Sequence, residues 1–273
     1  FFTYRLENMI FNKFFILFKI GRKIGKSNIV NIVSETHKIP VFIKLFFNLL
    51  AFSFSSSNNA KSKGKENLSE SIQEMGTTFI KLGQFLATRP DIIGEKLSKE
   101  LESLQDKLPP FSKKEAEKII IENLGQSNFD DIIDLSEPIA AASIAQVHKA
   151  KIKEDNIIKN VAIKVLRPNI KKIFNDEIDA IMLLAYIVES LISKTKRLKL
   201  IEVVFLFKEI TNHEMDLRFE AAAANEYAEN TKNDLGFFVP KIYWNFTGES
   251  VLTLDWVDGV SIREKDLLKE KNI

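Results

Sequence analysis

Residues 137–150 are EPIAAASIAQVHKA, and residues 161–164 are VAIK. The first segment has two runs that alternate as β-strands do. Between them lies a turn of small residues, namely Ala140, Ala141, Ala142 and Ser143. Lys164 ends a short apolar run twenty-one residues after that turn. The pattern predicts strands over Ile139–Ile152 and Val161–Leu166, with one charged side chain inside the second.

The small-residue loop and the strand lysine together are suited to hold a nucleotide. Backbone N–H groups of the loop and the Ser143 hydroxyl can bind phosphate. Alanine reaches less φ space than glycine, so the loop should be stiffer than a glycine-rich one. Lys164 can act on the phosphates as the strand lysine of protein kinases does, if a carboxylate such as Glu220 holds it. The alternatives are an ordinary hairpin turn and an edge strand with a solvated lysine.

The composition is that of a globular protein, with 45% hydrophobic and 28% charged residues among 273. The chain has no cysteine, which excludes disulfides and thiolate chemistry. It has three histidines, and without cysteine they make a zinc site an unfavoured reading. Residues 1–65 carry eleven Lys or Arg, two Glu and eleven of the 22 Phe. A basic, Phe-rich segment favours an anionic membrane surface over nucleic acid.

Two N-terminal stretches are apolar but interrupted by polar residues. Residues 1–20 contain Arg5, Lys13 and Lys19, and residues 39–54 contain Lys44 and Asn48. Because a bilayer requires roughly 20 apolar residues, neither stretch is assigned as a transmembrane helix. We give equal weight to an interfacial amphipathic segment and to a helix packed on the next domain. Residues 53–65 are a polar linker.

Helical periodicity dominates most of the remaining chain. It predicts helices with two breaks over 66–111, a long helix over 169–192, another over 201–230, and one beginning at Ser261. Ser112 and Glu115 form a capping box that opens a helix over Lys113–Leu124, and Gly125 ends it. Strand structure is expected again from Phe238 and over Val251–Val257.

Three more groups of residues are candidates for the site. Lys81 and Gln84 lie one helical turn apart and flank Gly83, which in a helix usually marks a close approach. They could reach into the nucleotide site; the alternative is a solvated lysine and a capping glutamine. Glu214 and Asp216 could hold Mg²⁺ through oxygen ligands. Their alternative is an ordinary surface, with Glu214 and Arg218 as an i,i+4 pair.

The strand over Val251–Val257 is the third candidate. Its end, Asp255 to Val257, could form a hinge whose backbone groups bind adenine. The alternative is a further sheet strand with Trp256 in the core.

Together and in this order, the motifs resemble the UbiB family of atypical protein-kinase-like proteins of ubiquinone biosynthesis. The resemblance runs from about Glu66 to the end and is specific as a set. It implies an α+β fold, with a kinase-like N-lobe of antiparallel sheet and helices preceded by a family-specific helical extension. It also implies ATP and Mg²⁺ as cofactors, with Lys164 and Glu220 at the phosphates. In the family the Lys-x-Gly-Gln element covers the active site, so Lys81 and Gln84 would face the nucleotide near Glu214 and Asp216.

These expectations divide the chain into four parts. Residues 1–65 are the basic N-terminal segment and linker, 66–136 the helical extension, 137–260 the N-lobe with a helical insertion, and 261–273 the start of a C-lobe. None of His37, His148 and His213 is followed by Asp two residues on, as a kinase catalytic loop requires. The Asp-x-Gly at Asp234 precedes the hinge and is interpreted as a turn. We therefore expect an enzyme of the transferase class only for the intact protein, an inactive chain alone, and no metal ligand assigned within it.

Function and location follow from the same resemblance. The expected function is an ATPase or phosphotransferase activity that supports ubiquinone biosynthesis at the membrane. The alternative is a non-catalytic, lipid-binding scaffold with a degenerate nucleotide pocket. Expected partners are membrane lipids or polyprenylated quinone precursors and quinone-biosynthesis proteins, with no nucleic acid; the oligomeric state is left open. The expected location is the cytoplasmic face of a bacterial inner membrane, or the matrix side in mitochondria.

Overall fold

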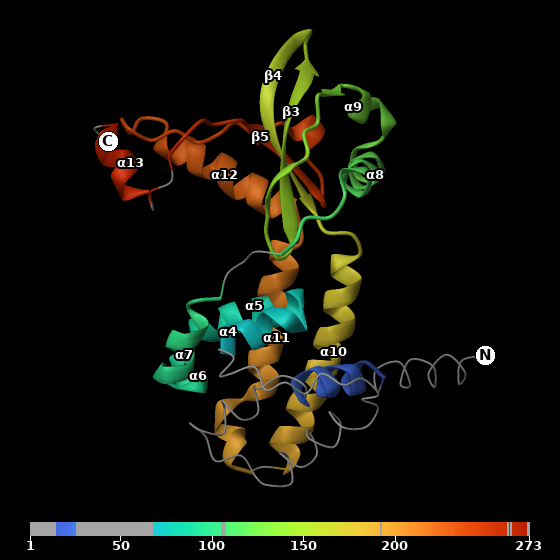
Figure 1. Cartoon of the computed structure of the whole chain (residues 1–273), viewed down its shortest axis with the longest axis vertical. Coiled ribbons are helices and arrows are strands. Elements are labelled where there is room, and N and C mark those ends of the chain that lie inside the picture. The colour runs from blue at the N-terminus through green and yellow to red at the C-terminus, as the bar shows by residue number, and fades with distance from the viewer. Residues whose placement is uncertain are drawn as a thin grey trace, which may run out of the picture. The chain divides into compact units, whose positions relative to one another are not determined.

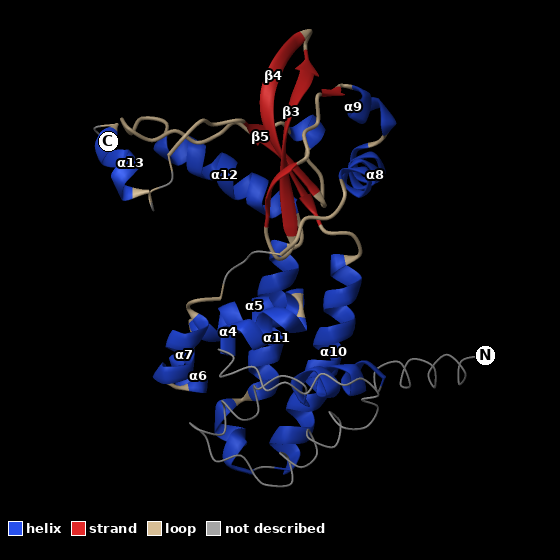
Figure 2. Ribbon diagram, in the orientation of Figure 1, coloured by secondary structure: helices blue, strands red, loops and turns tan. Residues whose placement is uncertain are grey.

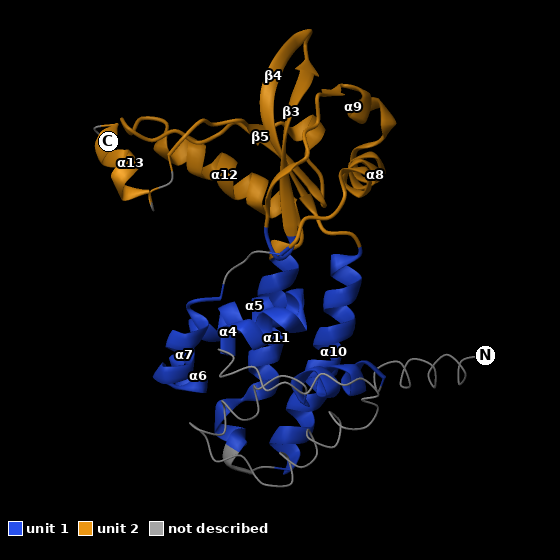
Figure 3. Ribbon diagram, in the orientation of Figure 1, with its two compact units in different colours: residues 1–108, 142–144, 169–213 blue, residues 109–141, 145–168, 214–273 orange. Residues whose placement is uncertain are grey.

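The computed structural model describes residues 15–25, 68–104, 108–191, 193–260, 262 and 264–271. The chain forms two compact units (Figure 3). Unit 1 comprises residues 1–108, 142–144 and 169–213, and unit 2 comprises residues 109–141, 145–168 and 214–273. These divisions differ from the segments expected from sequence order, because unit 2 begins within 66–136 and unit 1 includes 169–213.

Unit 1 contains a group of short helices that share one core. They are α4 (Leu68–Met75), α5 (Thr77–Ala87), α6 (Pro90–Ile93) and α7 (Glu95–Leu101) (Figure 1). Gly76 separates α4 from α5, and Gly94 separates α6 from α7. Their φ angles are 102° and 84°, values that favour glycine. The core residues are Leu68, Ile80, Leu97, Leu101 and Leu104. The expected helical run with breaks is confirmed for the described part of 66–111.

Two longer helices complete unit 1. They are α10 (Ile170–Leu191) and α11 (Leu200–Glu214), joined by the 3₁₀ helix η1 (Ser193–Leu198). Phe207 of α11 lies 5.6 Å from Phe174 of α10 and 5.6 Å from Phe85 of α5, between ring centroids. These aromatic contacts fix α5, α10 and α11 against one another.

The N-terminal region is described only over residues 15–25, which form a helix. Ile20 is buried, and Lys23 donates a hydrogen bond to the carbonyl of Met75 at 2.8 Å. This helix is therefore packed within unit 1. The other residues of the stretches 1–20 and 39–54, and the linker 53–65, lie outside the described residues. Among the helices described, none combines the length and apolar character needed to cross a bilayer.

Unit 2 contains an antiparallel sheet (Figure 2). Its strands are β1 (Ile132–Ile133), β2 (Pro138–Ala141), β3 (Ala145–Glu154), β4 (Ile157–Leu166) and β5 (Val251–Asp255). The order is β1-β3-β4-β5, and β2 also pairs with β3. Asp155 and Asn156 join β3 to β4 with φ angles of 51° and 61°, as a type I′ turn requires.

One face of the sheet packs against α8 (Lys113–Leu124), which α9 (Gln126–Asp130) follows. Val161, Ile163 and Val165 alternate along β4, are fully buried, and share a core with Ala116 and Ile120 of α8. The expected capping box at the start of α8 is confirmed, and so are both helix bounds and the terminating glycine.

The remaining elements of unit 2 are α12 (Leu217–Thr231), η2 (Trp244–Phe246) and α13 (Lys265–Glu270). The prediction of one helix over 201–230 is wrong, because α11 ends at Glu214 and α12 begins at Leu217. The strand structure expected from Phe238 is limited to an isolated bridge between Ile242 and Leu254. Leu235 and Gly236 form the expected turn. The antiparallel sheet with helices confirms the expected α+β class.

Candidate functional site

An ion pair joins the sheet of unit 2 to α12. The Lys164 Nζ of β4 donates to both carboxylate oxygens of Glu220, at 2.9 and 2.7 Å. The Lys164 side chain is 26% exposed, so a ligand can reach it from solvent. The structure thus brings together the two residues that the sequence paired, whose roles toward a nucleotide stay predictions.

Strand alternation explains where Lys164 points. Its neighbours Ile163 and Val165 are buried in the core with α8, so Lys164 lies on the opposite face. Across the strands it is paired with Val147 of β3 and Leu252 of β5. Helix α12 packs along β5, with Leu217 and Ala221 fully buried, and this packing brings Glu220 to Lys164.

The small-residue loop is partly exposed and partly buried. Ala140 is exposed and Ala141 half-buried at the end of β2, and Ala142 is half-buried. Ser143 is fully buried, and its carbonyl accepts a hydrogen bond from Thr77 Oγ1 at 3.2 Å within unit 1. In this state the Ser143 hydroxyl does not reach solvent, whereas Ala140 of β2 is exposed.

The expected hinge lies at the end of β5, which stops at Asp255 instead of Val257. The N–H of Asp255 donates to the carbonyl of Lys241, and the N–H of Trp256 donates to the carbonyl of Asn160, both at 3.0 Å. Val257 is 46% exposed. The N–H groups of Asp255 and Trp256 are therefore already used within unit 2, and adenine binding at this hinge stays a prediction. β5 is a strand of the sheet, as the alternative expected, but Trp256 is only half-buried and is therefore not a core residue.

Sequence reasoning missed the side-chain partner of Asp255. Tyr243, buried at 2% exposure, donates its hydroxyl to Asp255 Oδ1 at 2.6 Å. Burial and this hydrogen bond raise the pKa of Tyr243 well above its ordinary value, so the phenol remains protonated. The Nζ atoms of Lys159 and Lys241 lie 5.4 and 4.9 Å from the ring centroid, in cation–π range. No local pattern at Tyr243 indicates this role.

Asp216 has a structural task that the sequence did not reveal. As the N-cap of α12, its Oδ1 accepts from the backbone N–H of Arg218 at 3.1 Å. The Arg218 guanidinium also donates to both carboxylate oxygens, at 2.9 and 2.6 Å. Glu214 is exposed at the end of α11. Arg218 thus pairs with Asp216, and within the described ranges no group of three His, Cys, Asp or Glu is arranged for a metal ion.

The Lys-x-Gly-Gln element lies on α5 of unit 1. Lys81 and Gln84 are half-buried one turn apart, as expected. A Cβ added to Gly83 would lie 2.5 Å from Leu104 Cδ1 and 3.3 Å from Ile72 Cγ2. The close approach at Gly83 is therefore made by side chains of the unit's own core. That Lys81 and Gln84 face a nucleotide stays a prediction.

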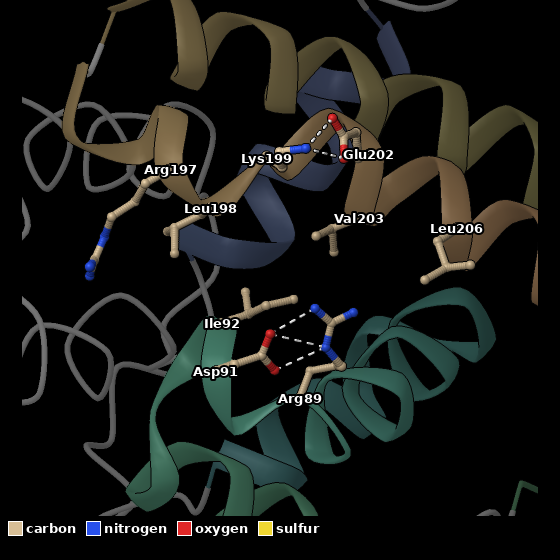
Figure 4. Close-up of a pocket in the computed structure, with 9 residues that line it drawn as sticks. All are labelled: Arg89, Asp91, Ile92, Arg197, Leu198, Lys199, Glu202, Val203 and Leu206. Atoms are coloured by element: carbon tan, nitrogen blue, oxygen red, sulfur yellow. Dashed lines mark hydrogen bonds and ion pairs between the residues drawn. The ribbon is translucent and has the colours of Figure 1, made fainter.

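Unit 1 also has a cavity of about 480 Å³ (Figure 4). Two ion pairs lie at its edge: Arg89 with Asp91 at 2.7 Å, and Lys199 with Glu202 at 2.9 Å. Its other lining residues are Ile92, Arg197, Leu198, Val203 and Leu206. Since Lys81 and Gln84 do not line it, this cavity is separate from the residues predicted to bind a nucleotide.

The antiparallel sheet, the strand lysine and the helix glutamate define a protein-kinase-like N-lobe. Comparison of the sequence with family models agrees, because the ABC1 atypical kinase-like domain matches residues 103–273. The chain belongs to this family of atypical kinase-like proteins, which is the UbiB family that the motifs resembled.

Named relatives support the same assignment. A "Probable protein kinase UbiB" of Marinobacter nauticus is 33% identical over 86% of this chain and 42% of its own length. The protein of that name from Pseudomonas paraeruginosa is 30% identical over 93% of this chain and 48% of its own. The protein of that name from Tolumonas auensis is 36% identical over 74% of this chain and 37% of its own length. The chain thus spans less than half the length of these curated relatives.

Proposed function

We propose that the intact protein binds ATP at the Lys164 face of the unit 2 sheet and acts as an atypical kinase or ATPase. The observation that carries the proposal is the ion pair between Lys164 and Glu220, at 2.7 Å. A strand lysine held by a helix glutamate is the arrangement with which kinases bind the α- and β-phosphates.

The residues around this pair fit a nucleotide in part. The ammonium of Lys164 is accessible and supplies positive charge for phosphate oxygens. The exposed Ala140 of β2 is a candidate phosphate contact, and Asp255 and Val257 are the candidate adenine contacts. Mg²⁺ fits less well, because Arg218 already occupies the Asp216 carboxylate. We therefore assign Mg²⁺ to the phosphates of ATP and derive no step from a protein metal site.

The biological role rests on the relatives. Their printed name, UbiB, supports a role in ubiquinone biosynthesis, and the basic, Phe-rich residues 1–65 support a membrane location. The proposed partners are membrane lipids or polyprenylated quinone precursors and other proteins of that biosynthesis.

Removal of the Lys164 ammonium tests the nucleotide site. In the intact protein, Lys164→Ala should weaken ATP binding by at least about tenfold, because a hydrogen-bonded charge pair to phosphate is lost. The measurement is isothermal titration of ATP with Mg²⁺ into wild type and variant.

Lys151→Ala is the matched control. Lys151 is also a strand lysine paired with a carboxylate, at 2.7 Å from Asp134, and its cross-strand partner on β4 is Asn160, four residues before Lys164. The control should keep wild-type affinity. Equal ATP affinity in wild type and Lys164→Ala would refute the role of Lys164. Binding of a lipid or quinone precursor without any ATP binding would favour the scaffold alternative.

A further inference from the structure

Unit 2 contains a buried polar relay outside the proposed nucleotide contacts. Gln146 and His148, two residues apart on β3, are both fully buried. Buried polar side chains of this kind are normally fully hydrogen-bonded, and here the partners are two backbone segments distant in sequence. One is Phe111, just after the chain enters unit 2 at Pro109, and the other is Ser136, two residues before β2.

The amide of Gln146 holds Phe111 at both ends of its backbone. The N–H of Phe111 donates to Gln146 Oε1 at 2.9 Å, and Gln146 Nε2 donates to the Phe111 carbonyl at 3.2 Å. The Arg167 guanidinium donates to the carbonyl of Pro109 at 3.0 Å, which holds the same segment from β4's end. The entry segment of unit 2 is therefore attached to the sheet by side chains.

The hydrogen bonds of Gln146 also determine the protonation state of His148. Gln146 Nε2 lies 2.9 Å from His148 Nε2 and can only donate, so His148 Nε2 must accept. The proton of the neutral ring then resides on Nδ1, which donates to the Ser136 carbonyl at 2.9 Å. One tautomer of neutral histidine satisfies every partner in the relay.

A proton added to His148 would disrupt the relay. Its new Nε2–H would face the N–H groups of the Gln146 amide. Rotation of that amide by half a turn would restore a bond to His148. It would also place Gln146 Nε2 against the Phe111 N–H and Oε1 against the Phe111 carbonyl, so both bonds to Phe111 would be lost.

The surroundings of His148 favour the neutral ring. Burial lowers the pKa of His148, and this effect is larger than the others. The charged groups that face it are Glu137 before β2 and Lys113 and Glu117 of α8; the two carboxylates oppose the lowering and Lys113 adds to it. On β4 its cross-strand partner is the uncharged Ile163.

We propose that Gln146 and His148 are positioning residues that form a proton-sensitive clamp between Phe111 and Ser136. Ser136 leads into β2, whose residue Ala141 is paired directly with Gln146. The clamp thereby fixes the position of β2, which leads into the alanine loop. This part of the inference rests on the proposed nucleotide site.

The tautomer is tested directly by long-range ¹H–¹⁵N spectra of the imidazole rings in the full chain between pH 8 and 5. We expect His148 to carry its proton on Nδ1 and to remain neutral below about pH 6.5, the ordinary pKa of histidine, because burial lowers its pKa. The chain has three histidines, so the His37→Asn and His213→Asn variants together assign the signal of His148. A proton on Nε2 of the neutral His148 ring, or protonation of that ring already above about pH 6.5, would overturn the clamp.

An inverted clamp separates the proposal from a purely structural role. Glu in place of Gln146 can accept from a protonated His148 but cannot donate to the Phe111 carbonyl. Gln146→Glu should therefore move the titration of His148 to higher pH. Because the bond to the Phe111 carbonyl is lost, the protection of backbone amides around Phe111 against hydrogen exchange should fall about tenfold. Gln126→Glu, an exposed change on α9, should alter neither. An unchanged His148 titration in Gln146→Glu would contradict the proposal.

The link to the nucleotide has its own readout. Gln146→Ala should weaken ATP binding about tenfold while Lys164 and Glu220 remain in place. If wild type does not bind ATP, the proposed function fails, but the tautomer and exchange results still decide the clamp. If Gln146→Ala loses protection at Phe111 and keeps wild-type ATP affinity, the clamp stands as an anchor and its role at the nucleotide site is refuted.

Discussion

Tyr243 illustrates how single residues support the candidate site from outside it. Its hydroxyl is the donor that satisfies one oxygen of the Asp255 carboxylate, and the backbone N–H of Lys241 satisfies the other at 3.1 Å. Because Asp255 ends β5, these two bonds fix the residue from which the proposed hinge begins. The carboxylate therefore holds the end of the strand.

We predict that Tyr243→Phe lowers the free energy of unfolding by about 1.5–3 kcal/mol, the usual contribution of a hydrogen bond to a charged group. The ring and its packing remain, so the effect isolates the hydroxyl. Urea unfolding of both proteins provides the measurement. Tyr227→Phe is the control, since Tyr227 is 50% exposed on α12. Equal stability of Tyr243→Phe and wild type would show that Asp255 does not need this donor.

Prediction of individual residues succeeded where the signal was local. The alternating apolar residues around Lys164 place it on a strand, and the family motifs add Glu220 as its partner. The pairing of Tyr243 with Asp255 and the burial of Ser143 against Thr77 were missed. Both depend on residues brought together by the fold, twelve and sixty-six positions apart, with no pattern between them.

At the level of elements, the start of α12 determines where Glu220 lies. Asp216 caps the helix and is four residues before Glu220. We predict that Asp216→Ala lowers the free energy of unfolding by about 1 kcal/mol through loss of the cap. It should also increase amide exchange in the first turn of α12, because the Arg218 N–H loses its acceptor.

Asp216→Asn distinguishes capping from charge. Asparagine caps nearly as well as aspartate but cannot form the ion pair with Arg218. Most of the stability should therefore return in Asp216→Asn, measured by the same urea unfolding. An Asn variant as unstable as the Ala variant would assign the effect to the ion pair with Arg218.

The sequence predicted elements well when their ends carried capping signals. The capping box of Ser112 and Glu115 predicted the start of α8, and Gly125 predicted its end; both predictions were right. The break after Glu214 was missed because residues 217–227, LRFEAAAANEY, favour helix and the apolar residues continue across it. Aspartate occurs both inside helices and at N-caps, so Asp216 alone does not predict the break.

At the level of the whole molecule, His148 links folding to pH. Its pKa is lowered in the folded chain, mainly by burial, so the unfolded chain binds this proton more readily. The contribution of the neutral His148 to the free energy of unfolding should be fully present above about pH 6.5, the ordinary pKa of histidine. It should fall as pH decreases below that value, by at most about 1.4 kcal/mol per pH unit from this group.

Urea unfolding at pH 8, 7, 6 and 5.5 measures this slope. His148→Gln should be less stable at all four values but should show a smaller change with pH. Identical slopes in wild type and His148→Gln would exclude His148 as the source.

The division into units was the least predictable property of the chain. Both α10 and α11 have apolar periodicity, which shows that they pack but not on which partner. Their assignment to unit 1 depends on Phe85 contacting Phe207, a pairing across more than a hundred residues. Sequence order suggested instead an insertion within the N-lobe.

The order of strands has a consequence for translation of this chain. Strands β3 and β4 are joined by a two-residue turn and can pair as soon as they leave the ribosome. Strand β5, the other neighbour of β4, is synthesised about 84 residues later, which takes about 4–17 s at ordinary rates. During that time one edge of β4 is unpaired and open to other chains. This strand carries Val161, Ile163 and Val165, which are fully buried in the native state. The nascent chain should therefore depend on chaperones most strongly between synthesis of Leu166 and synthesis of Val251.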